Sequence, residues 1–280
     1  MIDVILDGLL DTLKIMPYLF IAFLILEYLE HKISNKDKKI LSKNHKVGPL
    51  VGSLLGGLPQ CGFSAMASNL FSRRVITMGT LIAIYLSTSD EMLPIMISQK
   101  VPFIEIIKII GIKVLIGIIV GYIIDLITIK NKTIKTTEIE KMCDEEHCHC
   151  NEDGIFKSSI KHTINISFFI LLVNVGIGLV IYFIGEDALT NFMSQKNLLS
   201  YFIASLVGLI PNCAASVIIT QVYLLKLISF GTLLSGLLTG SGIGILLLFK
   251  TNKNIKENIK ILCIIYFVGV IVGIIADLLI

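Results

Sequence analysis

The chain contains 280 residues, 54% of them hydrophobic and 16% charged, and its mean hydropathy is +0.85. Soluble domains carry about 25% charged residues, so this composition argues against a soluble protein and predicts an all-α polytopic membrane protein. The net charge of +3 is small and the lysines fall between apolar stretches, which argues against nucleic-acid binding and indicates orientation in a lipid bilayer.

The first apolar stretch, residues 4–30, is predicted to form a membrane-spanning helix. Asp3, Asp7 and Asp11 lie four residues apart and therefore share one helical face. They form either a polar stripe, at the membrane edge or within the helix bundle, or part of a cation path. No basic region precedes this stretch and no small-residue cleavage site follows it, so we expect no removable signal peptide.

The second apolar stretch, residues 47–72, is interrupted in its middle. Pro59 lacks a backbone N–H and disfavours helical geometry at the residue before it. Each piece is shorter than the ~20 residues that cross a bilayer. A broken helix at membrane depth is tolerated only where protein or a wet cavity surrounds it. The sequence therefore predicts a re-entrant helical hairpin that turns at residues 59–61 and leaves on the side it entered.

Two further spans are predicted at residues 75–97 and 102–129. The first carries the sequence S-T-S-D-E, residues 87–91, near its far end. Two adjacent carboxylates in an apolar span are costly unless they are wet or paired. We therefore hypothesise that Asp90 or Glu91 binds a coupling proton or a cation. The alternative is that both belong to a solvated helix end.

A hydrophilic linker, residues 130–161, follows these spans. Its thiol and imidazole groups are flanked by acidic residues and are Cys143, His147, Cys148, His149 and Cys150. Their spacing is not that of a standard zinc fold, because adjacent residues cannot all reach one ion easily. The cluster is interpreted as a labile capture or sensing site for a soft metal ion, and the alternative is a solvated polar linker.

The second half repeats the first at an offset of 152 residues. The offset relates Pro59 to Pro211 and continues without a gap to Asp125 and Asp277, two aspartates that we interpret as structural. Such regularity indicates an internal duplication. The second half is therefore expected to contain spans at 164–184, 229–250 and 259–279 and an interrupted stretch at 198–225. The predicted domains are the first transmembrane repeat, the linker and the second transmembrane repeat, at residues 1–129, 130–161 and 162–280.

The positions of the lysines orient the two repeats. If each interrupted stretch returns to its own side, each repeat crosses the membrane three times, so the repeats have inverted topology. The lysine-rich loops at 31–46, 130–142 and 250–260 then fall on one side, which the positive-inside rule makes cytoplasmic. We expect two inverted-topology repeats, each with a Pro-broken re-entrant hairpin, with the N-terminus outside and the linker in the cytoplasm.

The two interruptions are predicted to meet near the membrane midplane and to form the substrate site, as paired interruptions do in transporters built from two repeats. Thiolates suit soft ions, and amide and hydroxyl oxygens suit harder ones. The alternative is that these polar groups satisfy the broken backbone and that the cysteines pack as small apolar residues. The predicted substrate-binding residues are Gln60, Cys61, Ser64, Asn69, Asn212, Cys213, Ser216 and Gln221.

Common enzyme signatures are absent from the sequence, including H-E-x-x-H, G-x-S-x-G, Walker A and the dinucleotide fingerprint. We therefore expect no enzyme and no cofactor apart from a transported or sensed metal ion, and we favour a secondary transporter that works by alternating access. A lipid-phosphate flippase or membrane phosphatase is one alternative, but it should place Arg or Lys at the hairpin tips, which contain none. A passive channel is another, and a homo-oligomer is compatible with the sequence.

Three motifs carry a family resemblance. They are G-L-P-Q-C-G-F-S at 57–64, S-T-S-D-E at 87–91 and P-N-C at 211–213. Together they resemble the ten-transmembrane heavy-metal exporter family of bacteria and archaea, whose members are labelled arsenic efflux proteins or manganese transporters. The resemblance implies ten membrane segments and export of a metal or metalloid ion across the plasma membrane of a prokaryote. Cysteines at both interruptions favour a thiophilic substrate, such as arsenite or a soft divalent ion, over manganese.

Overall fold

The computed structural model describes residues 47–57, 61–89, 92–129 and 198–279, together with isolated helical residues between 6 and 24 and between 156 and 176. Within these residues every regular element is a helix and no strand occurs, as the composition predicts. In the part of the chain that the structure describes, three helical stretches are long and apolar enough to cross a membrane, namely Met78–Ser98, Phe230–Thr251 and Ile255–Leu279.

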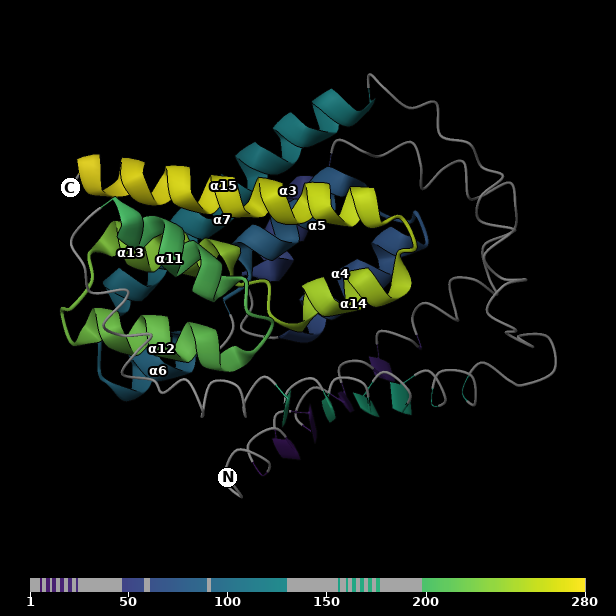
Figure 1. Ribbon diagram of the computed structural model, residues 1–280, viewed down its shortest axis with the longest axis horizontal. Helices are drawn as coiled ribbons and strands as arrows, with labels where there is room; N and C mark the ends of the chain where they lie inside the picture. Colours follow the sequence, from purple (N-terminus) through teal and green to yellow (C-terminus); the bar gives the residue numbers. More distant parts are fainter. Residues whose placement is uncertain are drawn as a thin grey trace.

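The described helices fall into two matching sets (Figure 1). The first half contains α3 (Gly48–Gly56), α4 (Cys61–Ser72), α5 (Met78–Ser87), α6 (Met92–Ser98) and α7 (Phe103–Ile129). The second half contains α11 (Leu199–Gly208), α12 (Cys213–Leu224), α13 (Phe230–Thr239), α14 (Ile243–Thr251) and α15 (Ile255–Leu279). The bounds of α4 and α5, moved by 152 residues, are the bounds of α12 and α13. The duplication in the sequence is therefore also a duplication of structure.

Both proline-containing stretches are broken in their middle, as expected. α3 ends at Gly56 and α4 begins at Cys61. In the second half α11 ends at Gly208 and α12 begins at Cys213. Each of these helices is too short to cross a membrane alone.

The spans predicted at 75–97 and 229–250 are present as Met78–Ser98 and Phe230–Thr251, but each is interrupted, which the sequence analysis did not predict. It placed the S-T-S-D-E motif near the far end of the first span. Instead α5 ends at Ser87 and α6 begins at Met92, while α13 ends at Thr239 and α14 begins at Ile243, so both interruptions lie near the middle of a span. Thr88 leaves helical geometry with a ψ of 127°, and Gly242 takes a positive φ of 53°, a conformation that favours glycine.

A set of hydrogen bonds ties the start of α5 to the end of α7. The Thr77 side chain caps α5 by accepting a hydrogen bond from the N–H of Thr80 at 3.1 Å. Asp125 accepts from the Thr77 hydroxyl at 2.7 Å and from the Gly79 N–H at 2.9 Å. A carboxylate at this point also offsets the partial positive charge of the helix N-terminus.

The second half repeats these bonds at the matching residues. Ser229 caps α13 by accepting from the N–H of Thr232 at 3.2 Å. Asp277 accepts from the Ser229 hydroxyl and, at 2.7 Å, from the Gly231 N–H. Tyr201 adds a hydrogen bond to Asp277 at 2.7 Å. The structure thus gives both aspartates the structural role that the sequence predicted.

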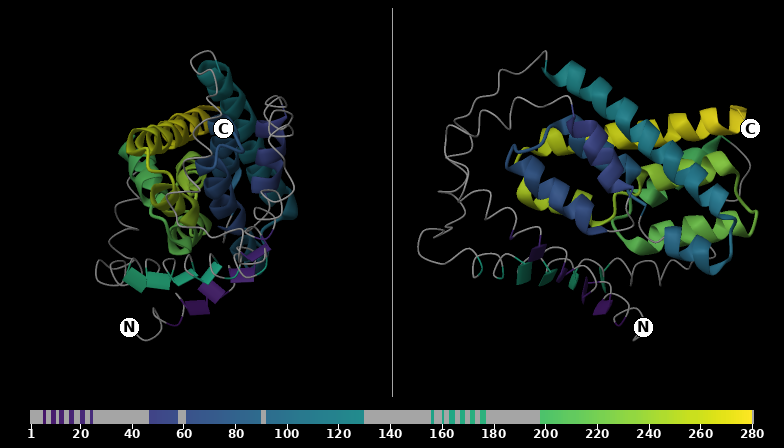
Figure 2. Two further views of the ribbon diagram at one scale, coloured as in Figure 1. Left: turned by 90° about the vertical axis from the view of Figure 1, so that its right-hand side faces the viewer. Right: turned by 180° about the vertical axis from the view of Figure 1, so that it is seen from behind.

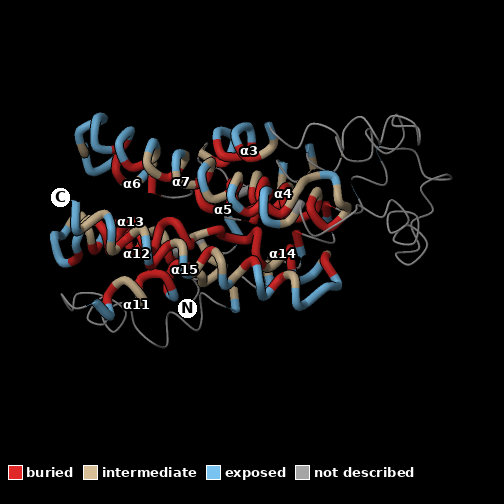
Figure 3. Tube along the Cα trace, turned by 90° about the horizontal axis from the view of Figure 1, so that it is seen from above, coloured by how far each residue is buried: buried red, intermediate tan, exposed pale blue. Residues whose placement is uncertain are grey.

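The two halves form adjacent helical bundles, and helices of each half pack against helices of the other (Figure 2). α4 of the first half packs along α14 of the second, and α12 of the second half packs on α6, the mate of α14. One buried cluster accordingly combines both halves, with Leu81 and Tyr85 beside Leu238 and Leu248. Figure 3 shows the buried residues gathered along α5 and α13 and the exposed ones toward the outside. The long mates α7 and α15 run in opposite directions along the molecule (Figure 1).

Candidate functional site

Many of the predicted site residues lie outside the described part of the chain. They are Gln60, Asp90, Glu91, Cys143, His147, Cys148, His149 and Cys150. Cys61 and Cys213 are the first residues of α4 and α12, but their side chains also lie outside the description. Among the described residues, no three His, Cys, Asp or Glu side chains come together as metal ligands do.

Ser64 lies where the two halves meet. It is fully buried on α4, and Gly244 at the start of α14 permits its close approach, because a Cβ on that glycine would lie 2.8 Å from the Ser64 Cβ. One turn further along α4, the hydroxyls of Ser68 and Tyr85 lie 2.7 Å apart. Both are within hydrogen-bond distance of the Gly244 carbonyl, at 2.7 and 3.0 Å. These contacts join α4 of the first half directly to the second half.

The other described candidates differ in exposure. Asn69 is 5% exposed, and its amide donates to the Ala65 carbonyl at 3.4 Å. Asn212 and Ser216 are half-buried around the start of α12, and Gln221 is exposed. The structure therefore places Ser64 and Asn69 in the interior, Asn212 and Ser216 at its margin, and Gln221 at the surface.

The break between α5 and α6 is rich in buried hydroxyls. Ser87, Thr88 and Ser89 are at most 1% exposed, so these three residues do not form a solvated helix end. The Thr88 hydroxyl donates to the Ile84 carbonyl at 2.7 Å. In the matching break, the Ser241 hydroxyl is buried and has no hydrogen-bond partner within the described residues.

Lys113 is a candidate that the sequence analysis missed. It lies in the middle of α7 and is 1% exposed. Its ammonium donates to the carbonyl of Thr88 and, at 2.9 Å, to the carbonyl of Leu237 in α13. One side chain thus connects the two broken spans. The sequence contained a signal, because a lysine inside a long apolar helix is costly and marks a function or a specific partner.

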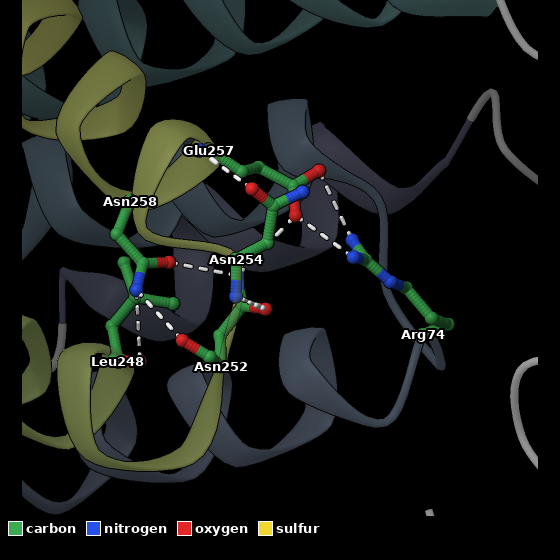
Figure 4. Close-up of polar contacts among 6 residues, drawn as sticks. All are labelled: Arg74, Leu248, Asn252, Asn254, Glu257 and Asn258. Atoms are coloured by element: carbon green, nitrogen blue, oxygen red, sulfur yellow. Dashed lines mark hydrogen bonds and ion pairs between the residues drawn. The ribbon is translucent and has the colours of Figure 1, made fainter. Parts of the chain in front are cut away.

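An ion pair joins the two halves at one end of the molecule (Figure 4). Arg74, in the turn after α4, donates to both carboxylate oxygens of Glu257 near the start of α15, at 3.1 and 2.8 Å. Asn252 also donates to Glu257, at 3.3 Å, and to the Asn258 side chain at 2.7 Å. This network fixes the turn between α14 and α15 against the turn between α4 and α5.

The matching residues at the other end form no such pair. The 152-residue offset relates Arg74 to Lys226 and Glu257 to Glu105, and both basic residues have positive φ, 58° and 60°. Although both are described, Lys226 and Glu105 form no ion pair. A pocket of about 150 Å³ lies beside Glu105, and its lining residues are Glu105, Lys108, Ile109, Tyr223 and Phe230.

A protein-family model covers the chain. The family is described as "Putative, 10TM heavy-metal exporter", and its model matches residues 1–186 and again residues 158–280. The two matches together extend over the whole length. No curated protein and no solved structure matches the chain.

Proposed function

This chain belongs to the 10TM heavy-metal exporter family, and we propose that it is a secondary transporter that exports a soft metal or metalloid ion by alternating access. As a member of a membrane family it is a multi-pass membrane protein. In the proposed cycle the repeats at 1–129 and 162–280 move against each other, and a site between them faces the two sides of the membrane in turn.

The observation that carries this proposal is the unequal state of two matching ion-pair positions. Arg74 and Glu257 are paired at one end, whereas Lys226 and Glu105 are unpaired with each other at the other end. Duplicated halves can exchange conformations, so the opposite state would pair Lys226 with Glu105 and separate the first pair. A molecule with one ion pair formed at one end, and a matching pair that could form at the other end when the first separates, is suited to alternating access.

The apolar side chains around the two positions differ in the same way. Tyr223 and Phe230 line the open pocket and are only partly buried. Their mates at the closed position, Phe71 and Met78, are 2% and 6% exposed. Closing the pocket would bury the two aromatic rings, and their burial would offset the exposure of Phe71 and Met78 when the other end opens.

The packing of α3 and α4 supports re-entrant hairpins. A Cβ on Gly48, at the start of α3, would lie 3.6 Å from the Thr80 Cβ near the start of α5. At the end of α3, a Cβ on Gly56 would lie 2.7 Å from the Ile84 carbonyl oxygen near the end of α5. α3 therefore runs beside α5 in the same direction, and α4 leads back to the start of α5 through the turn at 73–77. An element that enters and leaves at the same end has the path of a hairpin.

The directions of the long helices support inverted topology. α7 and α15 are mates and run in opposite directions (Figure 1). The linker follows α7, whose end is bonded to the start of α5 through Asp125. With the linker in the cytoplasm, the Arg74 and Glu257 pair closes the cytoplasmic end and the pocket at Glu105 opens outward. We assign the N-terminus to the outside and the membrane to the plasma membrane of a prokaryote.

We assign substrate binding to the residues that flank the two proline breaks. Cys61 and Cys213 are the first residues of α4 and α12. Both carry thiols, and thiolates favour soft ions. Asp90 and Glu91 follow the buried hydroxyls of the α5 break in sequence, so they are assigned to coupling. The pH dependence of transport distinguishes a coupled proton from another coupled cation.

We propose a separate role for the cysteine and histidine cluster of the linker, as a capture or sensing site for the metal. Because the cluster has no mate in the other half, it lies outside the duplicated core. Deletion of residues 143–150 should leave transport in vesicles intact. Cells that express this variant should show a growth advantage over non-expressing cells only at higher metal concentrations than cells that express the wild type. Loss of vesicle transport would contradict this assignment.

Export is tested with everted membrane vesicles and a panel of arsenite, Cd²⁺ and Mn²⁺. We expect gradient-dependent uptake of a soft ion, with loss of uptake in Cys61→Ser and in Cys213→Ser. The matched control is Cys263→Ser, because Cys263 is exposed on α15. Wild-type transport in both thiol variants would refute the thiol site, and flux that is independent of any gradient would indicate a channel.

A further inference from the structure

One face of α15 is exposed along the length of the helix, which runs along the outside of the molecule (Figure 1). The exposed positions on this face recur every three or four residues and therefore form a single stripe. They are Lys256, Lys260, Cys263, Phe267, Ile271, Ile275 and Leu278. On an outer helix of a membrane protein, such an apolar stripe contacts lipid chains. The stripe thus carries two lysines in its first turns and is otherwise free of charge.

The two lysines lie at the depth of the lipid headgroups. The hydrocarbon core of a bilayer is about 30 Å thick, which ~20 helical residues cross at about 1.5 Å each. Counted back from Leu279, the last residue of α15, the core ends near Lys260. Lys256 lies one turn further out, ~6 Å into a headgroup layer roughly 5–8 Å thick. Both side chains are exposed at this level.

We propose that Lys256 and Lys260 bind the headgroup of an anionic phospholipid whose acyl chains lie along the apolar part of the stripe. Side chains four residues apart are neighbours on a helix surface, so one phosphate can contact both ammonium groups. Basic residues at the membrane surface attract anionic lipids. With the linker in the cytoplasm, this lipid belongs to the inner leaflet. The leaflet depends on the proposed topology, and the site itself does not depend on which ion is exported.

The other half of the molecule shows that the fold does not require this pair of charges. The 152-residue offset relates Lys256 to Ile104, which is 78% exposed, and Lys260 to Lys108. The Lys108 ammonium lies 5.3 Å from the centre of the Phe230 ring. The offset relates Phe230 to Met78, so Lys260 has no ring at the corresponding position. Two exposed lysines four residues apart are thus a property of α15 and not of its mate.

Other charged groups at this end have partners of their own. Glu257, which follows Lys256, is bonded to Arg74. Lys250 and Lys253 interact with other groups, so neither is assigned to the lipid site. The acidic residues of the linker lie outside the described residues and, in the proposed topology, on the same side of the membrane. They are the rival partners of the two lysines, and a comparison of lipids decides between them.

The first test measures the thermal stability of the purified full-length protein in an uncharged detergent with added lipid. Phosphatidylglycerol should raise the Tm at lower concentrations than phosphatidylcholine. Lys256→Gln and Lys260→Gln should each increase the phosphatidylglycerol concentration for half of the effect about fivefold, and the double variant about 25-fold. Arginine at both positions should preserve the wild-type value. The matched control is Lys108→Gln, which should change this concentration by less than about twofold.

Selectivity among lipids separates this site from its rivals. An equal response of the wild type to both lipids would overturn the proposal, and this comparison needs no variant to fold. An unchanged response in the double variant would also overturn it and would show lysines that pair with the linker or only orient the chain. Stabilisation by glycerol 1-phosphate at the same concentrations would indicate a soluble ligand and would likewise overturn the lipid site.

The second test locates the bound lipid. Cys263 is exposed on the same stripe, about one turn from Lys260. A fluorophore is attached to Cys263 in a chain whose other five of six cysteines are replaced by serine, and the protein is placed in nanodiscs. Brominated phosphatidylglycerol should quench the fluorophore more strongly than brominated phosphatidylcholine at the same mole fraction.

Changing both lysines to glutamine should remove this difference in quenching. Equal quenching by the two lipids in the chain that keeps both lysines would show that anionic lipid does not gather at this end of α15, and would overturn the proposal. Neither test measures transport. Failure of the export proposal would therefore leave both results unaffected, and failure of the lipid site would leave the export proposal unaffected.

Discussion

Arg74 and Glu257 lie 183 residues apart in the chain and form a two-point ion pair across the interface between the halves. The side chains are 28% and 10% exposed, so water screens the pair only in part. Because a planar guanidinium binds both carboxylate oxygens, the pair fixes orientation as well as distance. It lies where the halves must separate if this end is to open.

Loss of this pair should destabilise the conformation described here. Arg74→Gln is expected to lower the free energy of unfolding by about 1–3 kcal/mol, the range for lost hydrogen bonds to a charged group. The exchange Arg74→Glu with Glu257→Arg should recover most of the loss. Unfolding in detergent measures both, and additive effects of the two single changes would contradict a direct interaction.

The residues that match this pair, Lys226 and Glu105, should affect the rate of transport without affecting the stability of the conformation described here. Lys226 and Glu105 are unpaired with each other in this conformation, so Glu105→Gln should leave Tm unchanged. If they pair in the opposite state, the same change should slow transport by about tenfold, equivalent to ~1.4 kcal/mol. Lys226→Gln should slow transport to a similar extent. The double variant should transport no more slowly than either single variant. A fall in Tm without a fall in rate would contradict the exchange of ion pairs.

The contact between α4 and α14 should tolerate no added atom. A Cβ at Gly244 would lie 2.8 Å from both the Ser64 Cβ and a ring carbon of Tyr85. Gly244→Ala is therefore expected to cost about 1–3 kcal/mol of stability. The control is Gly111→Ala, because no heavy atom lies within 4 Å of a Cβ at that position. The control should be neutral or stabilising by up to about 1 kcal/mol, and equal losses in both variants would contradict the close approach.

The capping aspartates should be distinguishable from a coupling carboxylate by pH. Asp125→Asn and Asp277→Asn weaken the bonds at the starts of α5 and α13, so each should lower stability by about 0.5–2 kcal/mol. Neither should change the pH dependence of transport. Asp90→Asn should change it, if this residue carries the coupling ion. An unchanged rate and pH profile in Asp90→Asn would exclude that residue from coupling.

The duplication and the proline breaks could be predicted because they depend on local chemistry. Pro59 and Pro211 cannot continue a helix wherever they occur, and a constant offset needs no knowledge of packing. The second pair of breaks was missed for a related reason. Serine and threonine at residues 87–89 are compatible with a helix, and the apolar residues on both sides made the span look continuous. Gly240 and Gly242 in the mate were the available warning.

The contacts between the halves could not be predicted, because they depend on which distant segments meet. The lysine in α7 was visible in the sequence, but its acceptors at Thr88 and Leu237 lie 25 and 124 residues away. The offset also relates Arg74 to Lys226 and Glu257 to Glu105. It cannot show which of the two possible pairs is formed in one conformation, because that depends on the state of the whole interface.

The packing of α4 on α14 has a consequence for how the protein is made. When residues 61–72 leave the ribosome and enter the bilayer, their partner at 243–251 has not yet been synthesised. The Ser68 hydroxyl then lacks the Gly244 carbonyl that it contacts in the finished protein. The amino-terminal repeat therefore lies in the membrane without this packing partner until nearly the whole polypeptide has been inserted. A nonsense mutation before the codons for α14 would leave α4 without its partner, and we expect such a truncated chain to be more accessible to membrane proteases.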